Sequence, residues 1–163
     1  MTSTHSEAHK KIGELIKDIR MAMMTTVGTD GALHSRPMAT QEKEFDGVLW
    51  FMTRQDSGKV NEIRHDAQVN LTYADGKETF VSISGHAAVS RDRKKIDDLW
   101  NPLYKAWFPG GKDDPEITVL RVDVEEAEYW DAPANAVVRN VKMLTAALTG
   151  GKNNVGEHEK VRL

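Results

Sequence analysis

Short runs of β-branched, aromatic and other apolar residues recur along this chain at fairly regular spacing, and turn-forming residues separate them. Gly28 and Gly31 lie between the first two runs, Asp46-Gly47 precedes the third, and Asp75-Gly76 joins two later ones. These residues favour tight turns between antiparallel strands, since glycine adopts positive φ at little cost. The sequence therefore predicts an antiparallel sheet. The expected strands are residues 21–27, 32–38, 48–53, 69–73, 80–89, 117–124 and 127–130.

Side chains alternate in character along the predicted strand 80–89. Phe80, Ser82, Ser84 and His86 fall on one face, and the other face carries apolar residues, namely Val81, Ile83 and Ala87. Successive side chains of a strand point to opposite faces of the sheet. One face of this strand is therefore expected to meet the core and the other to meet solvent or a polar cavity.

Four helices are predicted around the strands. Apolar residues spaced by three and four positions predict the first over residues 6–20. Others are expected over 57–65, over 93–107, where Pro102 implies a kink or an early stop, and over 134–148, before Gly150-Gly151. The tail 151–163 is polar and is expected to be loosely held. A chain of 163 residues suits one domain, so we expect a mainly β barrel with flanking helices, an α+β fold.

Composition excludes several classes of function. The formal net charge is -3 and the pI is about 6.1, so no basic field attracts nucleic acid or anionic lipid. The chain lacks cysteine, which leaves redox chemistry to a bound cofactor. No apolar stretch matches a signal peptide or a membrane span, and a cytoplasmic location is expected.

Two segments have the residues to bind a phosphate. In the first, Arg36 precedes Pro37, which cannot donate to a sheet ladder, although a surface arginine on an edge strand is the competing interpretation. In the second, a strand runs into a helix whose first turn carries Ser57, Gly58 and Lys59. Free N–H groups, a hydroxyl and an ammonium can converge there on one anion. An ordinary N-cap at Ser57 with a solvated Lys59 is the alternative.

Other motifs contribute less. Trp130 ends the last predicted strand, where it either lines a ring-shaped ligand or belongs to the core. The chain has no G-x-G-x-x-G dinucleotide motif, no P-loop and no G-x-S-x-G nucleophile elbow, and its histidine spacing does not favour zinc. His34 and His86 are candidate acids or bases only because histidine titrates near neutral pH.

Several segments, taken in order, resemble the pyridoxamine 5'-phosphate oxidase superfamily, and within it the FMN-binding general stress protein 26 branch. Trp107 to Pro115 also resembles that branch. The segments that carry the resemblance are His34-Ser35-Arg36-Pro37-Met38, Phe51-Met52-Thr53, Ser57 with Lys59, Ser84-Gly85-His86-Ala87 and Tyr129-Trp130-Asp131.

The resemblance implies a split β-barrel that binds FMN between the two subunits of a homodimer. It assigns the phosphate to Arg36 and Lys59 with Ser57 and Thr53. The isoalloxazine would lie against Pro37, Met38 and Met52, beside Phe51, with Thr79 or Phe80 near the flavin and Trp130 reaching it from the partner subunit. The apolar faces of 21–27 and of 81–87 are also expected to exceed what one barrel interior absorbs, which favours a dimer interface.

The reaction is less constrained than the cofactor. Residues 132–148 form a largely apolar segment where vitamin-phosphate oxidases carry basic and aromatic residues, so oxidation of pyridoxamine phosphate is not expected. An oxidoreductase that takes electrons from reduced nicotinamide is the leading hypothesis. A non-catalytic flavin-binding or flavin-sensing protein, and a barrel that holds haem or a deazaflavin, are the alternatives.

Overall fold

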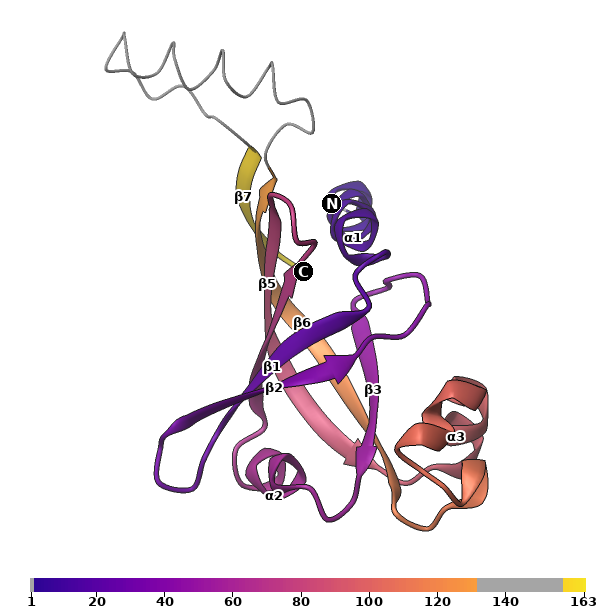
Figure 1. The fold of residues 1–163 in the computed structure, drawn as a ribbon. Coiled ribbons are helices and arrows are strands. Elements are labelled where there is room, and N and C mark those ends of the chain that lie inside the picture. The colour runs from indigo at the N-terminus through magenta and orange to yellow at the C-terminus, as the bar shows by residue number, and fades with distance from the viewer. Residues whose placement is uncertain (1, 132–156) are drawn as a thin grey trace, which may run out of the picture.

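The computed structural model describes residues 2–131 and 157–163, which form one antiparallel sheet with helices at its ends (Figure 1). The strands follow the order β2-β1-β4-β5-β6-β3, and β7 also pairs with β6. Their bounds are β1 Met21–Val27, β2 Leu33–Ala39, β3 Val48–Arg54, β4 Gln68–Ala74, β5 Thr79–Ser90, β6 Ile117–Asp131 and β7 Glu157–Arg162. The helices are α1 Thr2–Ile16, α2 Gly58–His65 and α3 Arg93–Leu99, with short 3₁₀ segments η1 Pro102–Ala106 and η2 Gly111–Asp113.

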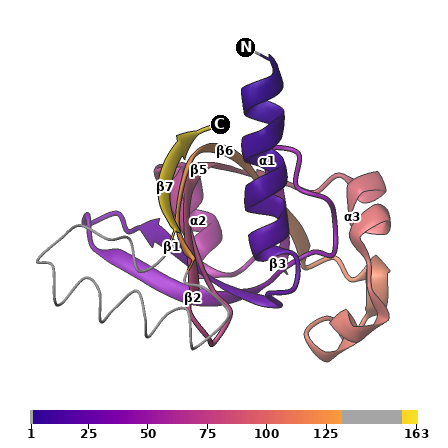
Figure 2. The ribbon, with the colours of Figure 1, turned by 90° about the horizontal axis from the view of Figure 1, so that it is seen from above.

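The sheet curls into a barrel that remains split between its two edge strands. Seen from above in Figure 2, the strands surround the barrel axis, with α1 over one end and α2 at the other. The edge strands β2 and β3 are in contact but are not paired with each other in the sheet. The predicted mainly β, antiparallel barrel is confirmed.

The barrel interior holds the main core, to which alternate residues of each strand contribute. Ala22 and Met24 of β1 face inward, and so do Val81, Ile83 and Ala87 of β5, none of them more than 4% exposed. For Val81, Ile83 and Ala87 the expectation that one barrel would be overfilled was therefore wrong, because the interior holds them, whereas of the run 21–27 it holds the inward-facing residues alone. The outer face instead carries Met21, Met23, Phe80 and Trp130, each more than 40% exposed.

Strand β6 differs from the two strands predicted for this region. It continues from Ile117 to Asp131, and its register with β5 shifts between Ser84 and Gly85. The shift leaves Glu125 without an opposite residue on β5, as in a β-bulge, which bends a strand without ending it. The same point divides the other edge of β6, which pairs with β3 before the bulge and with β7 after it.

The C-terminal tail also departs from its prediction. Residues 157–162 were expected to be loosely held but form β7, which pairs with β6 from Glu126 to Asp131. Cross-strand pairs explain why so polar a segment becomes a strand, since Lys160 lies 2.8 Å from Glu126 and His158 lies 2.7 Å from Glu128. The helix predicted over 134–148 lies outside the described residues.

Two predicted helices end earlier than expected. The helix predicted over 6–20 has the expected length but runs from Thr2 to Ile16, and Ile19, still buried, lies in the turn before β1. The second ends at Leu99, and Pro102 begins η1, where the Asn101 side chain accepts a hydrogen bond from the Leu103 amide. The early stop predicted at the proline is therefore confirmed. Within the described residues, no helix is long and apolar enough to span a membrane.

Candidate functional site

A cavity of about 420 Å³ opens where the barrel is split, between the edge strands β2 and β3. Met21 of β1, the start of α2 and the η1 segment complete its walls, so five separate parts of the chain form it. Its volume lies within the range of about 300–1,000 Å³ that is typical of small-molecule sites. The lining residues are Met21, Pro37, Met38, Ala39, Met52, Thr53, Arg54, Asp56, Ser57, Lys59, Tyr104, Trp107 and Phe108.

Lys59 is the central polar group of this cavity. It lies in the first turn of α2, half-buried, and its ammonium donates to Thr53 Oγ1 at 2.9 Å and to Ser57 Oγ at 2.6 Å. Burial lowers the pKa of Lys59, and the nearby positive charge of Arg36 lowers it further. Among the described residues no carboxylate lies within ion-pair distance of Lys59; Asp56, in the same cavity, pairs with Arg54. The cavity therefore contains a cation that only neutral hydroxyls contact.

Ser57 does not act as an ordinary helix cap. It occupies the N-cap position of α2 with extended backbone, but its hydroxyl makes no capping hydrogen bond and accepts from Lys59 instead. A serine at this position normally accepts from a backbone N–H of the first turn. The first amides of α2 consequently stay available next to the ammonium, which is the arrangement that suits an anion.

Arg36 lies beside this cluster but does not line the cavity. Its guanidinium donates to the buried Thr26 hydroxyl at 2.6 Å and lies 3.7 Å from a Glu62 carboxylate oxygen. Glu62 also accepts from Thr26 at 2.6 Å and contacts His34 Nδ1 at 3.0 Å. The Thr26 hydrogen bond, and then the hydrogen bond and charge of His34 and the charge of Arg36, lower the pKa of Glu62 despite partial burial. Arg36 on β2 thus pairs with Glu62 within a network that runs from β1 to α2.

The structure brings together six of the residues predicted to form the site. These are Pro37, Met38, Met52, Thr53, Ser57 and Lys59, and Arg36 is linked to them through Thr26 and Glu62.

Phe51, Thr79 and Trp130 lie elsewhere. Phe51 is 1% exposed in the barrel core. Thr79 Oγ1 donates a hydrogen bond to Asp131 Oδ1 at 2.8 Å, where the start of β5 pairs with the C-terminal end of β6. Trp130, on that same end, is 41% exposed and stacks on His158 with a ring-centroid distance of 5.1 Å. Within one chain, these three residues do not reach the cavity.

An aromatic wall was missed by the sequence reasoning. Tyr104, Trp107 and Phe108 come from η1 and the residue pair after it, and Trp107 is 56% exposed. The segment from Trp107 carried part of the family resemblance, but no site role was assigned to it. The signal was the close spacing of three aromatic residues around Pro109, outside any predicted strand.

The two candidate histidines do not line the cavity. His34 contacts Glu62, and His86, on β5, contacts Glu125 at the bulge. Their contacts are those of surface ion pairs rather than of groups directed at a substrate.

Comparison with known proteins matches this fold and this chain to one family. Residues 7–154 match the model of the family described as pyridoxamine 5'-phosphate oxidase like. Protein bli-3 of Neurospora crassa is 30% identical over 153 residues, which cover 87% of this chain and 73% of that protein. General stress protein 26 of Bacillus subtilis is 25% identical over 128 residues, or 76% of this chain and 88% of that protein.

A solved structure extends the comparison. The general stress FMN/FAD binding protein of Xanthomonas citri is 32% identical and superposes with a TM-score of 0.68, over 80% of this chain and 94% of that one. Motif order, barrel topology and these matches agree. The chain belongs to the pyridoxamine 5'-phosphate oxidase-like family, in its general stress protein 26 branch.

Proposed function

We propose that this protein binds FMN in the cavity between β2, β3, α2 and η1, as a homodimer, and uses it as an oxidoreductase. The observation that carries the proposal is the half-buried Lys59 ammonium, which contacts two hydroxyls and, within 2–131 and 157–163, no carboxylate. A desolvated cation without a counter-charge is unfavourable in the free protein, and an anion relieves that cost. The name of the Xanthomonas citri relative, which mentions FMN and FAD, supports a flavin as the ligand.

The cavity suits the two halves of FMN. Lys59, Ser57 and Thr53, together with the first amides of α2, form the phosphate end, and Arg36 adds positive charge nearby. Pro37, Met38 and Met52 form an apolar surface beside that end, which suits a planar ring system. Because the polar groups gather at one end of the cavity, we expect one phosphate to be recognised and FMN to bind more tightly than FAD.

FMN would supply the electron transfer, and the chain would supply position and a site of low polarity. Electrons would come from reduced nicotinamide and pass to a small acceptor. The charged lining residues are Lys59 and the Arg54–Asp56 ion pair, and we assign them to binding and orientation.

The homodimer rests on an exposed apolar row across the outer face of the sheet. Phe80 of β5 lies opposite Trp130 of β6 and Ala74 of β4. Met23 of β1 lies on the same face beside this row, opposite Pro37 of β2 and Thr72 of β4. Phe80 is 49% exposed and Met23 is 42% exposed. A second copy of the chain would cover this row and would bring Trp130 of one protomer toward the cavity of the other.

Titration with FMN, FAD and riboflavin tests the proposal. Riboflavin has the same ring as FMN but no phosphate, so the ratio of the two affinities isolates the phosphate end of the site. We expect affinity in the order FMN, then FAD, then riboflavin. Failure of FMN to bind, or equal affinity for FMN and riboflavin, would remove the proposed role of Lys59.

Two further measurements separate the alternatives. A visible spectrum of the protein as isolated distinguishes flavin from haem and from a deazaflavin, which absorb differently. Steady-state oxidation of reduced nicotinamide by the FMN complex then tests turnover. Bound FMN with no turnover would identify a flavin-binding or flavin-sensing protein instead of an oxidoreductase.

A further inference from the structure

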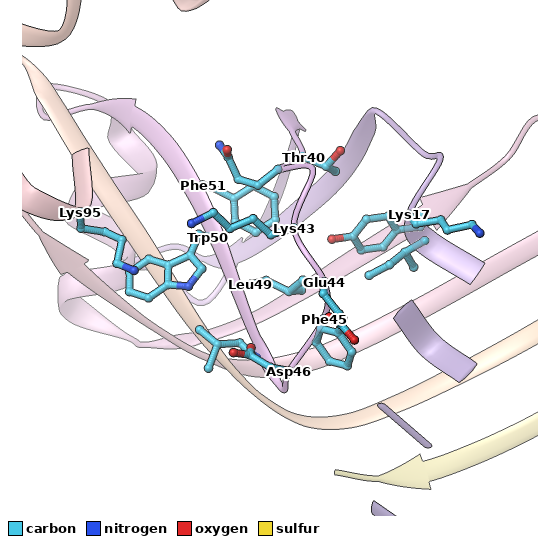
Figure 3. Close-up of a pocket in the computed structure, with 14 residues that line it drawn as sticks. Lys17, Thr40, Lys43, Glu44, Phe45, Asp46, Leu49, Trp50, Phe51 and Lys95 are labelled. Carbon is cyan, nitrogen blue, oxygen red and sulfur yellow. The ribbon is translucent and has the colours of Figure 1, made fainter. Parts of the chain in front are cut away.

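A second cavity, which we call the loop cavity, lies beneath the segment that joins β2 to β3 and has a volume of about 160 Å³. Residues of this segment, α1, β3, β4 and α3 surround it, and it shares no lining residue with the cavity proposed for FMN. Four aromatic rings contribute to its walls, namely Tyr73 together with Phe45, Trp50 and Phe51, the three that are labelled in Figure 3. A cavity of roughly 150 Å³ lined by apolar side chains is large enough for benzene. The loop cavity therefore has room for a molecule with one aromatic ring.

The phenol of Tyr73 points to a ligand with a hydrogen-bond acceptor. Tyr73 is 1% exposed and lines the cavity, yet its hydroxyl has no hydrogen-bond partner among the described residues. Burial raises the pKa of Tyr73, so the phenol keeps its proton at neutral pH. Because Tyr73 lines the cavity, an acceptor on a ligand bound there can receive this O–H.

Lysine side chains gather at the same cavity. Lys17, Lys43 and Lys95 line it together with two acidic residues, Glu44 and Asp46. In Figure 3, Lys43 extends toward Trp50, over whose ring the Lys95 ammonium lies at 4.2 Å, whereas Lys17 extends away from Trp50.

The two ammonium groups near Trp50 keep their positive charge available. Neither Lys43 nor Lys95 has a carboxylate within ion-pair distance in the described part of the chain. Asp46 accepts a hydrogen bond from the Val48 amide at 3.1 Å, and the three lining lysines outnumber the two lining carboxylates. This edge of the cavity therefore favours a negatively charged group on the ligand.

We propose that the loop cavity binds a small aromatic acid, with a single ring among the aromatic side chains. Lys43 and Lys95 would hold its carboxylate, and the Tyr73 phenol would donate to an oxygen substituent on the ring. The inference does not depend on flavin binding, since the two cavities have separate linings.

Isothermal titration calorimetry with 4-hydroxybenzoate tests this site, on the wild-type chain with and without saturating FMN. We expect binding that FMN does not displace. Tyr73→Phe should weaken it about five- to tenfold and Lys43→Gln about tenfold, the loss of one hydrogen bond and of one charged contact. Lys94→Gln is the matched control, because Lys94 is an exposed α3 lysine that does not line the cavity. The affinity of this variant for 4-hydroxybenzoate should equal that of the wild type.

A neutral analogue separates the two contacts. The affinity for 4-hydroxybenzamide should fall in Tyr73→Phe and stay unchanged in Lys43→Gln, whereas a general loss of structure would lower both. Absence of 4-hydroxybenzoate binding at millimolar concentration would overturn the proposal. So would displacement by FMN, or wild-type affinity in both the Tyr73→Phe and the Lys43→Gln variants.

Discussion

The Lys59 ammonium donates to the Ser57 hydroxyl at 2.6 Å, the side chain that would otherwise cap α2. A serine at this position usually caps the helix, but here its hydroxyl accepts the Lys59 hydrogen bond at the cavity wall. This relationship makes Lys59 the most direct test of the site.

Replacing Lys59 by methionine should weaken FMN binding by about 1.5–3 kcal/mol, the size of a hydrogen bond to a charged group, and leave riboflavin binding nearly unchanged. Methionine keeps much of the aliphatic length, so the fold should persist. Fluorescence titration with both flavins measures the difference. Lys94→Met, on the exposed face of α3, should alter neither affinity. Parallel losses for FMN and riboflavin would show that Lys59 supports the cavity rather than the phosphate.

Arg36→Ala should weaken FMN binding less than Lys59→Met and lower stability more. Arg36 lies off the cavity lining, where it contacts the buried Thr26 hydroxyl and the Glu62 carboxylate. Its removal takes a charged partner from both groups. Urea unfolding of the two flavin-free variants ranks their stabilities, and FMN titration ranks their affinities. A larger loss of FMN affinity in Arg36→Ala than in Lys59→Met would assign Arg36 directly to the phosphate, and a smaller loss of stability would contradict its structural role.

Glu62 should make the free energy of unfolding fall as the solution becomes acidic. Its pKa is below the ordinary value of 4.5 in the folded chain, because Thr26 and His34 bind the carboxylate and Arg36 lies nearby. Above pH 4.5 both folded and unfolded states are ionised and the stabilisation is complete. As the pH falls from 4.5 through the lowered pKa, the unfolded state binds the proton first, so stability is lost across that window.

Comparison of wild type and Glu62→Gln by urea unfolding between pH 3 and pH 7 isolates this contribution. We expect the wild type to be more stable at pH 7 and the difference to shrink toward pH 3. A difference that stays constant with pH would mean that the carboxylate charge contributes nothing.

Gly85→Ala should destabilise the barrel by about 1–3 kcal/mol, the usual cost of overpacking a filled site. An added Cβ would lie 2.2 Å from the Asp123 carbonyl oxygen at the β-bulge, so strand backbone must move. Gly58→Ala is the control, because no heavy atom lies within 4 Å of its added Cβ, and we expect a change below about 0.5 kcal/mol. Thermal or urea unfolding of flavin-free protein compares them. Equal stability of the two variants would contradict the close approach at the bulge.

Phe80→Glu should shift the protein from dimer to monomer. Phe80 is 49% exposed beside Trp130 on the outer face, and a buried charge at an interface is strongly unfavourable. Light scattering at micromolar concentration measures the mass, for which one chain is 18.3 kDa. Leu103→Glu, at a residue that is 75% exposed on η1, should leave the dimer intact. A wild-type monomer that binds FMN tightly would remove both the interface and the role of Trp130.

The inward and outward faces of the strands, and the turns between them, could be predicted because both depend on residues that are close in sequence. Alternation in 80–89 predicted the buried face of β5, and Asp75-Gly76 predicted the β4–β5 turn, in which Gly76 has φ of +76°. Six residues of the cavity were predictable for a similar reason. They fall in two short segments, 37–38 on β2 and 52–59 from the end of β3 into α2, and their motif order indicates the family.

Long-range pairing decided the rest. Continuity of β6 through Glu125 depends on Gly85 of another strand, and the polar segment 157–162 becomes β7 only because β6 offers it a free edge. Arg36 meets Glu62, 26 positions later, rather than the cavity, since α2 packs against β1. Tyr73 and Lys43 likewise face one cavity only after the barrel closes. Local backbone geometry depends on residues that are close in sequence. Which side chains meet across the barrel depends on strand register and on the curvature of the sheet.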